Sequence, residues 1–134
     1  MIKKNLHNLL PVPTSHNAGM KRVLISRKET ESKITQIAVT ELTCHTKINE
    51  HTHPDMDEYF YIMKGGDKYR IKGGDEMQQV PYTNKQTDKS VMTITIDGSV
   101  HECTQEDIIY VPAGSSHALE ALSDITIMTI GVER

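Results

Sequence analysis

The stretch from His51 to Gly65 constrains this chain more than any other part of it. It begins His-Thr-His-Pro-Asp-Met-Asp-Glu and continues with a run rich in aromatic and apolar residues. Side chains two residues apart on a β-strand point to the same face, so His51 and His53 can direct two imidazoles at one point. The polar turn after His53 predicts a hairpin that brings the carboxylate of Glu58 back towards them. Two imidazoles and a carboxylate are three ligands of a divalent-metal site.

Residues 107–117 form a second informative segment, which reads Asp-Ile-Ile-Tyr-Val-Pro-Ala-Gly-Ser-Ser-His. A short apolar run ends at Pro112, and the turn that follows contains Gly114. His117 then opens the next predicted strand, where its imidazole is available as a further ligand.

Together the two segments resemble the two conserved motifs of the cupin superfamily. The first matches the family pattern of His-x-His, four residues, Glu, six residues, Gly at every defined position, and the second matches at its proline, glycine and histidine. In cupins the two histidines and the glutamate of the first motif and the histidine of the second bind one metal ion. The resemblance therefore implies that His51, His53, Glu58 and His117 hold one divalent metal ion.

Three positions depart from the family pattern without touching a ligand. The glycine that usually precedes the first histidine by six residues is His45, and the glycine that usually opens the second motif is Glu106. The asparagine that usually follows His117 by four residues is Ala121. We therefore expect metal binding to be kept, but a different backbone path in the turn before His51.

The distribution of Ile and Val predicts an all-β domain of short strands joined by turns. An Asp97-Gly98 pair is a typical hairpin turn, and no helix is expected beyond a short turn near the N-terminus. The resemblance narrows the fold to a double-stranded β-helix, that is, a jelly-roll β-barrel. The expected strands, the hairpin counted as one segment, are residues 23–25, 34–43, 48–64, 91–96, 99–104, 108–111, 117–122 and 125–132.

The length of 134 residues predicts one domain. Residues 1–20 are expected to form an extended N-terminal arm, and residues 21–134 a single barrel. A polar, glycine-rich stretch at about 67–90 is a long insertion. The insertion begins about seven residues after Glu58, which is roughly 20 Å further along the same strand. We therefore expect it at the end of the barrel remote from the metal.

Composition excludes several classes of function. A net charge of −3 argues against a nucleic-acid partner, and no segment is long and apolar enough to span a membrane. The N-terminus lacks the apolar run of a secretory signal, so a cytoplasmic location is expected, with Cys44 and Cys103 as reduced thiols. For both cysteines a small, buried apolar role is the expected one.

Side-chain parity predicts which neighbours share the cavity with the metal. Counting by two from Glu58 and from His117 gives the inward-facing residues Phe60, Ile62, Leu119 and Ala121. The alternate residues of the first strand should face outward, namely Tyr59, Tyr61 and Met63. Because these outward side chains need cover, and because cupins commonly pair through a sheet and an exchanged arm, a homodimer is expected.

No catalytic residue or organic cofactor can be assigned from the sequence. Tyr110 and His101 are candidate general bases by residue type alone, and His101 is expected to be a solvated strand residue. A surface role is expected for the remaining candidates, which are His7, His16, His45 and Lys47.

The sequence leaves two classes of function open. One is a metal-dependent enzyme, an oxygenase, isomerase, lyase or decarboxylase, acting on a small polar or anionic metabolite. The other is a non-catalytic cupin that binds or senses a small molecule. Three imidazoles and a carboxylate admit Fe, Mn, Ni, Zn or Cu, so the identity of the metal stays open.

Overall fold

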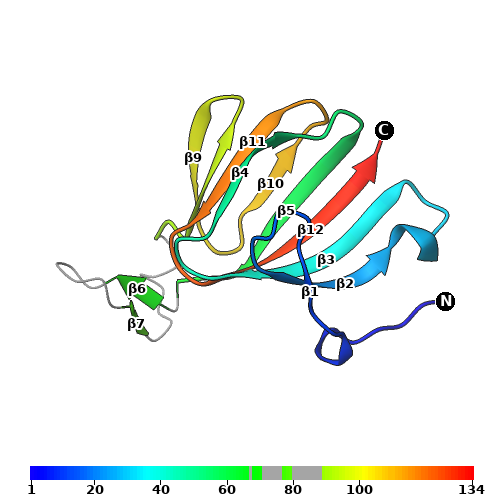
Figure 1. Cartoon of the computed structure of the whole chain (residues 1–134), viewed down its shortest axis with the longest axis horizontal. Helices are drawn as coiled ribbons and strands as arrows, with labels where there is room; N and C mark the ends of the chain where they lie inside the picture. Colours follow the sequence, from blue (N-terminus) through cyan, green and yellow to red (C-terminus); the bar gives the residue numbers. More distant parts are fainter. Residues whose placement is uncertain (67, 71–76, 80–88) are drawn as a thin grey trace.

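The computed structural model describes residues 1–66, 68–70, 77–79 and 89–134, and these are almost entirely β-structure (Figure 1). Two single 3₁₀ turns, η1 (Leu6–Asn8) and η2 (Arg27–Glu29), are the helical elements of this part of the chain. The strands are β1 (Val12–Pro13), β2 (Met20–Ser26), β3 (Ile34–Leu42), β4 (Lys47–Thr52), β5 (Met56–Lys64), β6 (Lys68–Arg70), β7 (Met77–Gln79), β8 (Met92–Ile96), β9 (Ser99–Cys103), β10 (Ile108–Val111), β11 (Ser116–Ala121) and β12 (Ile125–Glu133).

Two antiparallel sheets face each other and enclose the core. The first has six strands in the order β1-β2-β3-β12-β5-β10, and the second has four in the order β4-β11-β8-β9. Neighbours in a sheet are mostly distant in sequence, because the chain crosses repeatedly from one sheet to the other. This is the double-stranded β-helix, or jelly roll, that the sequence predicted.

The alternation of side chains along β5 and β11 places the core as predicted. Phe60 and Ile62 are buried, whereas Tyr61 between them is 38% exposed. On β11, Leu119 and Ala121 are buried in step with His117. The core is built from aliphatic side chains with one aromatic ring, and its members are Leu42, Phe60, Ile62, Val91, Met92, Ile94, Cys103, Val111, Leu119, Ala121, Ile125 and Ile127.

Residues 1–20 lie along the edge of the six-stranded sheet. β1 pairs with the start of β2, with Val12 opposite Lys21, so the arm is tied down by backbone hydrogen bonds. The loop that joins them is closed by Thr14, whose hydroxyl group donates to the Ala18 carbonyl (2.9 Å) and accepts from the Ala18 N–H (3.0 Å). This arrangement fixes the position of the loop beside the barrel.

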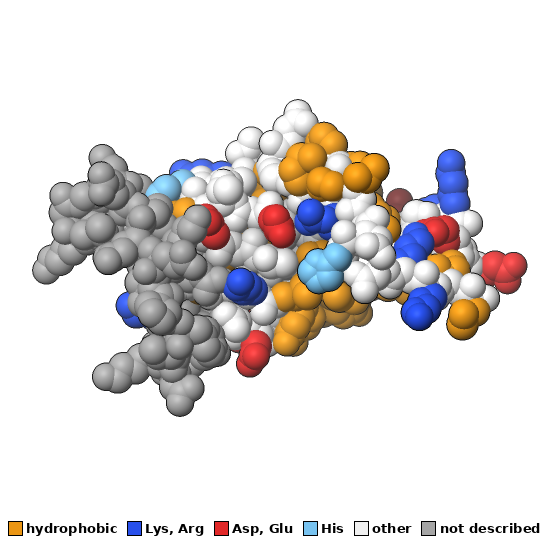
Figure 2. Space-filling model, turned by 90° about the horizontal axis from the view of Figure 1, so that it is seen from below, with side chains coloured by type: hydrophobic (Ala, Val, Ile, Leu, Met, Phe, Trp, Pro, Cys, Tyr) orange, Lys and Arg blue, Asp and Glu red, His pale blue; other side chains and the backbone are white. Residues whose placement is uncertain are grey.

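Part of the predicted insertion at 67–90 lies outside the described residues. The strands β6 and β7 pair only with each other, and they follow the end of β5 that is remote from Glu58 (Figure 1). In the described residues no helix is long and apolar enough to cross a membrane. Figure 2 shows cationic and anionic side chains interspersed on one face, which fits the small net charge.

In the part of the chain that the structure describes, four residues other than glycine have a left-handed backbone: Asn17, His45, Asp97 and Glu106. Asp97 (φ +47°) and Gly98 (φ +85°) form the predicted hairpin turn between β8 and β9. His45 and Glu106, which replace glycines of the family pattern, both have φ +74°, the region that favours glycine. Both turns thus adopt a backbone conformation that glycine would adopt without a steric cost.

The left-handed conformation of Glu106 gives a stability prediction. It costs about 1–2 kcal/mol for a residue with a Cβ, and glycine removes that cost while losing about 0.5–1 kcal/mol of backbone entropy. We expect Glu106→Gly to raise the free energy of unfolding by about 0.5–1 kcal/mol in urea titrations. Glu102→Gly, in the extended edge strand β9, is the matched control and should lower it; a loss in both variants would contradict the argument.

Candidate metal centre

Four side chains from both sheets converge at one end of the barrel. His51 on β4 lies opposite His117 on β11 in the four-stranded sheet, and Glu58 is on β5 in the six-stranded sheet. His53 follows directly after β4. One ligand atom from each of these four residues lies within 4.8 Å of the others, which is the spacing of a group that can surround one ion. The structure thus brings together all four predicted ligands.

The connection from His53 to Glu58 is not the hairpin that we expected from the sequence. β4 and β5 belong to different sheets, so the short turn between them carries the chain across the barrel. A hairpin and a crossing share the same pattern of strand, polar turn and strand, and sequence periodicity cannot tell them apart. The crossing improves the site, because it places the carboxylate on the wall that faces the imidazoles.

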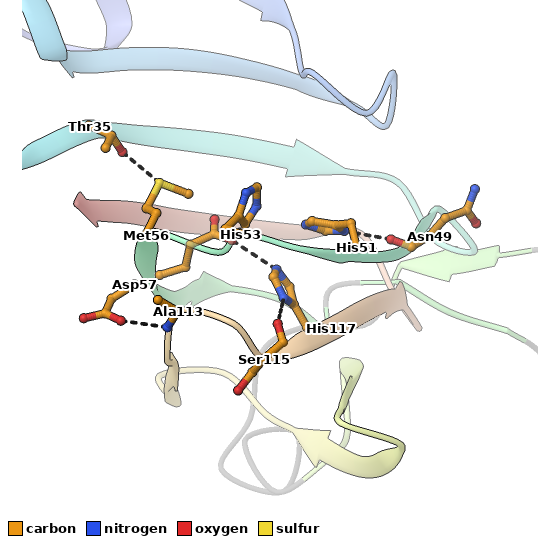
Figure 3. A network of polar contacts seen from close by, with 10 residues as sticks. Thr35, Asn49, His51, His53, Met56, Asp57, Ala113, Ser115 and His117 are labelled. Atoms are coloured by element: carbon orange, nitrogen blue, oxygen red, sulfur yellow. Dashed lines mark hydrogen bonds and ion pairs between the residues drawn. The ribbon is translucent and has the colours of Figure 1, made fainter. Parts of the chain in front are cut away.

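Backbone carbonyls orient two of the three imidazoles (Figure 3). His51 Nδ1 lies 2.8 Å from the Asn49 carbonyl and His117 Nδ1 lies 3.2 Å from the Ser115 carbonyl. A carbonyl can only accept, so Nδ1 carries the hydrogen in each ring and Nε2 is left as the metal-binding atom. Such contacts are the usual support of a metal-binding histidine.

The turn of the second motif is bound to the first motif. The Gly114 N–H donates to the His53 carbonyl (2.9 Å), and the Ala113 N–H donates to Asp57 Oδ1 (2.8 Å). Arg134 Nε donates to the same carboxylate oxygen at 2.9 Å. The Ala113 N–H and then the Arg134 guanidinium lower the pKa of Asp57, so this anchor stays charged at neutral pH. These contacts fix the position of His53 relative to that of His117.

The electrostatics around Glu58 fit a cation. Its Oε1 lies 3.0 Å from His53 Nε2 and 3.0 Å from His117 Nε2, and the residue is 8% exposed. Burial lowers the pKa of His53 more than Glu58 raises it, so this ring is neutral, as a ligand must be. Burial also opposes charge on His117, but the hydrogen bonds to Glu58 and the Ser115 carbonyl outweigh it and raise its pKa.

The donor set passes a chemical test for a divalent metal. His117 has an acceptor at each ring nitrogen, so its Nε2 must carry a proton unless a cation lies between that nitrogen and Glu58. A metal ion held by His53, Glu58 and His117 would take the place of this proton. Three imidazoles and one carboxylate suit Zn, Fe, Mn, Ni and Cu, and nothing in the geometry selects among them.

Three of the four residues, His51, His53 and Glu58, line a pocket of about 190 Å³, and His117 is buried beside them. Apart from the candidate ligands, its lining has an apolar part and a polar part, and the polar part comes from β2, β3, β12 and the loop before β2. The apolar part comprises Ile48, Met56, Phe60, Leu119 and Ile127, and the polar part Thr14, Ser15, His16, Lys21, Gln36, Thr40 and Thr129. The parity argument found Phe60 and Leu119, but not the polar wall.

His16 is the site residue whose position the sequence analysis missed. Its side chain is exposed, as expected, yet its ring centroid lies 4.3 Å from that of His51, with the planes tilted by 39°. The closed loop of Thr14 and Ala18 holds it there at the mouth of the pocket. No local signal predicts this, because the contact depends on β1 pairing with β2 at the edge of the sheet.

The other candidates from the sequence lie away from the pocket. Tyr110 is 47% exposed on the outer face, where its ring stacks on Tyr59 with centroids 5.0 Å apart. His101, His45 and Lys47 are exposed as expected. Of the cysteines, Cys103 is buried in the core, where burial raises the pKa of its thiol to about 11, whereas Cys44 is only half-buried.

Comparison with known proteins identifies the fold. No family model and no curated protein matches the sequence. Three solved structures superpose along almost the whole chain: a predicted oxalate decarboxylase from Thermotoga maritima (TM-score 0.73, 15% identity, 99% of this chain and 100% of that one), ectoine synthase from P. lautus (0.70, 14%, 99% and 78%) and the cupin domain of Cnp3 from Schizosaccharomyces pombe (0.67, 10%, 99% and 74%).

These similarities confirm the resemblance at the level of the fold. The chain has the fold of a small cupin, and the cupin structures share it at sequence identities of 10–15%. Identity this low does not carry an activity or a ligand from one protein to the other. The chemistry must therefore be argued from the residues of the site.

The geometry predicts that the imidazole of His51 is needed for metal binding and that the neighbouring imidazole of His16 is not. His51→Ala should lose most of its metal, because strand β4 fixes that ring and the remaining three ligands cannot close the gap. His16→Ala is the matched control: the same change 4.3 Å away, outside the four-residue group, should leave metal content unchanged. Elemental analysis, with circular dichroism to show that both variants fold, decides this. Equal metal in both would place the site elsewhere.

Proposed function

We propose that this chain is a metal-dependent cupin enzyme that acts on a small polar or anionic metabolite. One observation carries the proposal: three imidazoles and a carboxylate meet at the wall of a pocket that a ligand can enter. The His117 side chain is only 1% exposed, but the His53 side chain is 32% exposed. The ligand group is therefore enclosed on one side and accessible on the other, which is typical of a catalytic rather than a closed structural metal site.

The size of the pocket limits the ligand. A volume of about 190 Å³ corresponds to roughly six water molecules at about 30 Å³ each. This is smaller than the range of about 300–1,000 Å³ for pockets that bind drug-sized ligands. The proposed substrate is thus a small metabolite and not a nucleotide or a polymer.

The residues that line the pocket have two roles in this proposal: some exclude water, and others orient the bound metabolite. Phe60, Leu119 and Ile127 keep the inner end apolar, which strengthens electrostatic interactions there. Thr40 and Thr129, which also line the pocket, offer hydroxyl groups to a bound metabolite. A divalent ion held by the four ligands supplies Lewis-acid polarisation to a carbonyl or carboxyl group. Oxygenase, isomerase, lyase and decarboxylase chemistry are all compatible with this arrangement.

An enzymatic role is compatible with this fold, since two proteins that share it bear the names of enzymes. By name, one is a predicted oxalate decarboxylase and another is an ectoine synthase. The decisive experiment is a screen of small carboxylic acids and keto acids with the protein loaded in turn with Fe, Mn, Ni, Zn and Cu, read out by mass spectrometry of the acid. Consumption of one acid would establish an enzyme, whereas tight binding without consumption would establish the binding or sensing alternative.

Replacement of Glu58 tests the role of its charge in any turnover found. Glu58→Gln keeps an oxygen that can coordinate but removes the one negative charge of the ligand set, so we expect partial metal loss and at least a tenfold lower rate per bound metal. Glu41→Gln, an exposed residue of β3, is the control and should retain the parent rate. An unchanged rate per metal in Glu58→Gln would contradict the assignment.

We also propose that the protein is a homodimer through the outer face of the six-stranded sheet. On this face Tyr61 of β5 lies opposite Ile108 of β10, and these residues are 38% and 61% exposed. The stacked rings of Tyr59 and Tyr110 belong to the same two strands. Exposed apolar side chains gathered on one face are typical of an interface. The partners that we propose are therefore a small-molecule ligand and a second copy of this chain.

Light scattering at micromolar concentration tests the dimer. The parent should have twice the mass of the chain, and Tyr61→Lys should be monomeric because it buries a charge in the proposed interface. Val100→Lys, at a position 67% exposed on β9 of the other sheet, is the control and should remain dimeric. A monomeric parent would refute the proposal.

A further inference from the structure

Lys21 lies in the pocket with no role in binding the metal. It stands near the start of β2, opposite Thr40 of β3, and its Nζ donates to Gln36 Oε1 at 3.0 Å. Gln36 and Thr40 lie on the same face of β3, four residues apart, and both line the pocket. The side chain of Lys21, a half-buried residue, therefore runs along the inner face of the six-stranded sheet and belongs to the polar part of the lining.

The ammonium group of Lys21 has unused binding capacity. It carries three N–H donors, and the hydrogen bond to Gln36 uses one of them. Among the described residues no carboxylate lies within ion-pair distance of it; its partner is a neutral amide. Because this partner is neutral, a carboxylate that enters the pocket can form a charge-assisted hydrogen bond with the ammonium group.

The charges of the pocket are arranged in two separate places. Glu58, the carboxylate of the pocket lining, lies against His53 and His117 and is used there. Lys21 is on a different strand of the same sheet, and β3 and β12 lie between β2 and β5. A metabolite that fills the pocket can therefore contact the metal ligands with one group and the lysine with another.

We infer that Lys21 is the anion-binding residue of this pocket and that the metabolite carries a carboxylate group separate from the group that faces the metal ligands. The inference rests on the proposed function, because it takes the four-ligand group as the other anchor. Gln36 acts as a positioning residue: its amide oxygen accepts from Nζ and holds the ammonium group against the wall. The substrate class is thus a small acid with two polar ends, such as a dicarboxylate or a keto acid.

The test measures binding and does not need turnover. Protein loaded with Co(II) is titrated with malonate, succinate and glutarate and with propionate, butyrate and pentanoate, the monocarboxylates of equal length, and the visible spectrum of Co(II) reports binding. At least one dicarboxylate should bind about ten- to a hundredfold more tightly than its monocarboxylate, as expected for a hydrogen bond between charged groups of about 1.5–3 kcal/mol.

Variants assign this preference to the lysine. Lys21→Met keeps an unbranched side chain one atom shorter and removes the charge, so it should abolish the preference while Co(II) content and monocarboxylate affinity stay at the parent values. Lys21→Arg should retain a preference. Lys28→Met, at an exposed position on η2 outside the pocket lining, controls for the loss of one positive charge and should behave as the parent.

The outcomes separate this inference from the function on which it rests. A parent protein that holds Co(II) and shows the same dicarboxylate preference as Lys21→Met would overturn the inference alone. A parent that shows no preference for any dicarboxylate would do the same. A parent that does not hold Co(II) would overturn the proposed function and this inference with it.

Discussion

The antiparallel pairing of β4 with β11 is the constraint on which the site depends. It sets His51 directly opposite His117, so two ligands from distant parts of the chain become neighbours through backbone hydrogen bonds. A slip of one residue in this register would turn one of the two imidazoles to the outer face of the sheet. Since the inner face of β11 also carries buried Leu119 and Ala121, core packing itself prevents that slip.

The remaining ligands are fixed by the crossing between the sheets. The chain leaves β4 at His53 and enters the other sheet at Met56, and the Asp57 carboxylate holds the turn of the second motif beside this crossing. Glu58 is the first inward-facing residue after it that can bind a metal, with buried Phe60 and Ile62 further along the same face. Polar chemistry is thereby confined to one end of the barrel, and the apolar core stabilises the other.

The division of the pocket into two walls has a physical origin in the sheet order. The four candidate metal ligands come from β4, β5 and β11 and from the residue after β4, whereas the polar wall comes from β2, β3, β12 and the loop before β2. These latter strands lie at the arm side of the six-stranded sheet, where β1 adds the edge. The N-terminal arm is thus part of the pocket through His16 and its neighbours, and not a separate appendage.

The spacing of His51, His53 and Glu58 predicted three converging side chains, and the resemblance to cupins, carried by these residues and the histidine after the Pro-x-Gly turn, implied the fourth ligand and the jelly roll. Period-two alternation likewise predicted the inward Phe60, Ile62, Leu119 and Ala121, because side-chain parity is a local property of a strand. Tertiary structure alone decided that β4 and β5 lie in different sheets, and that His16 and Lys21 reach the pocket. Those features depend on which strands pair over long distances, and a pairing between remote segments leaves no mark in the pattern of either one.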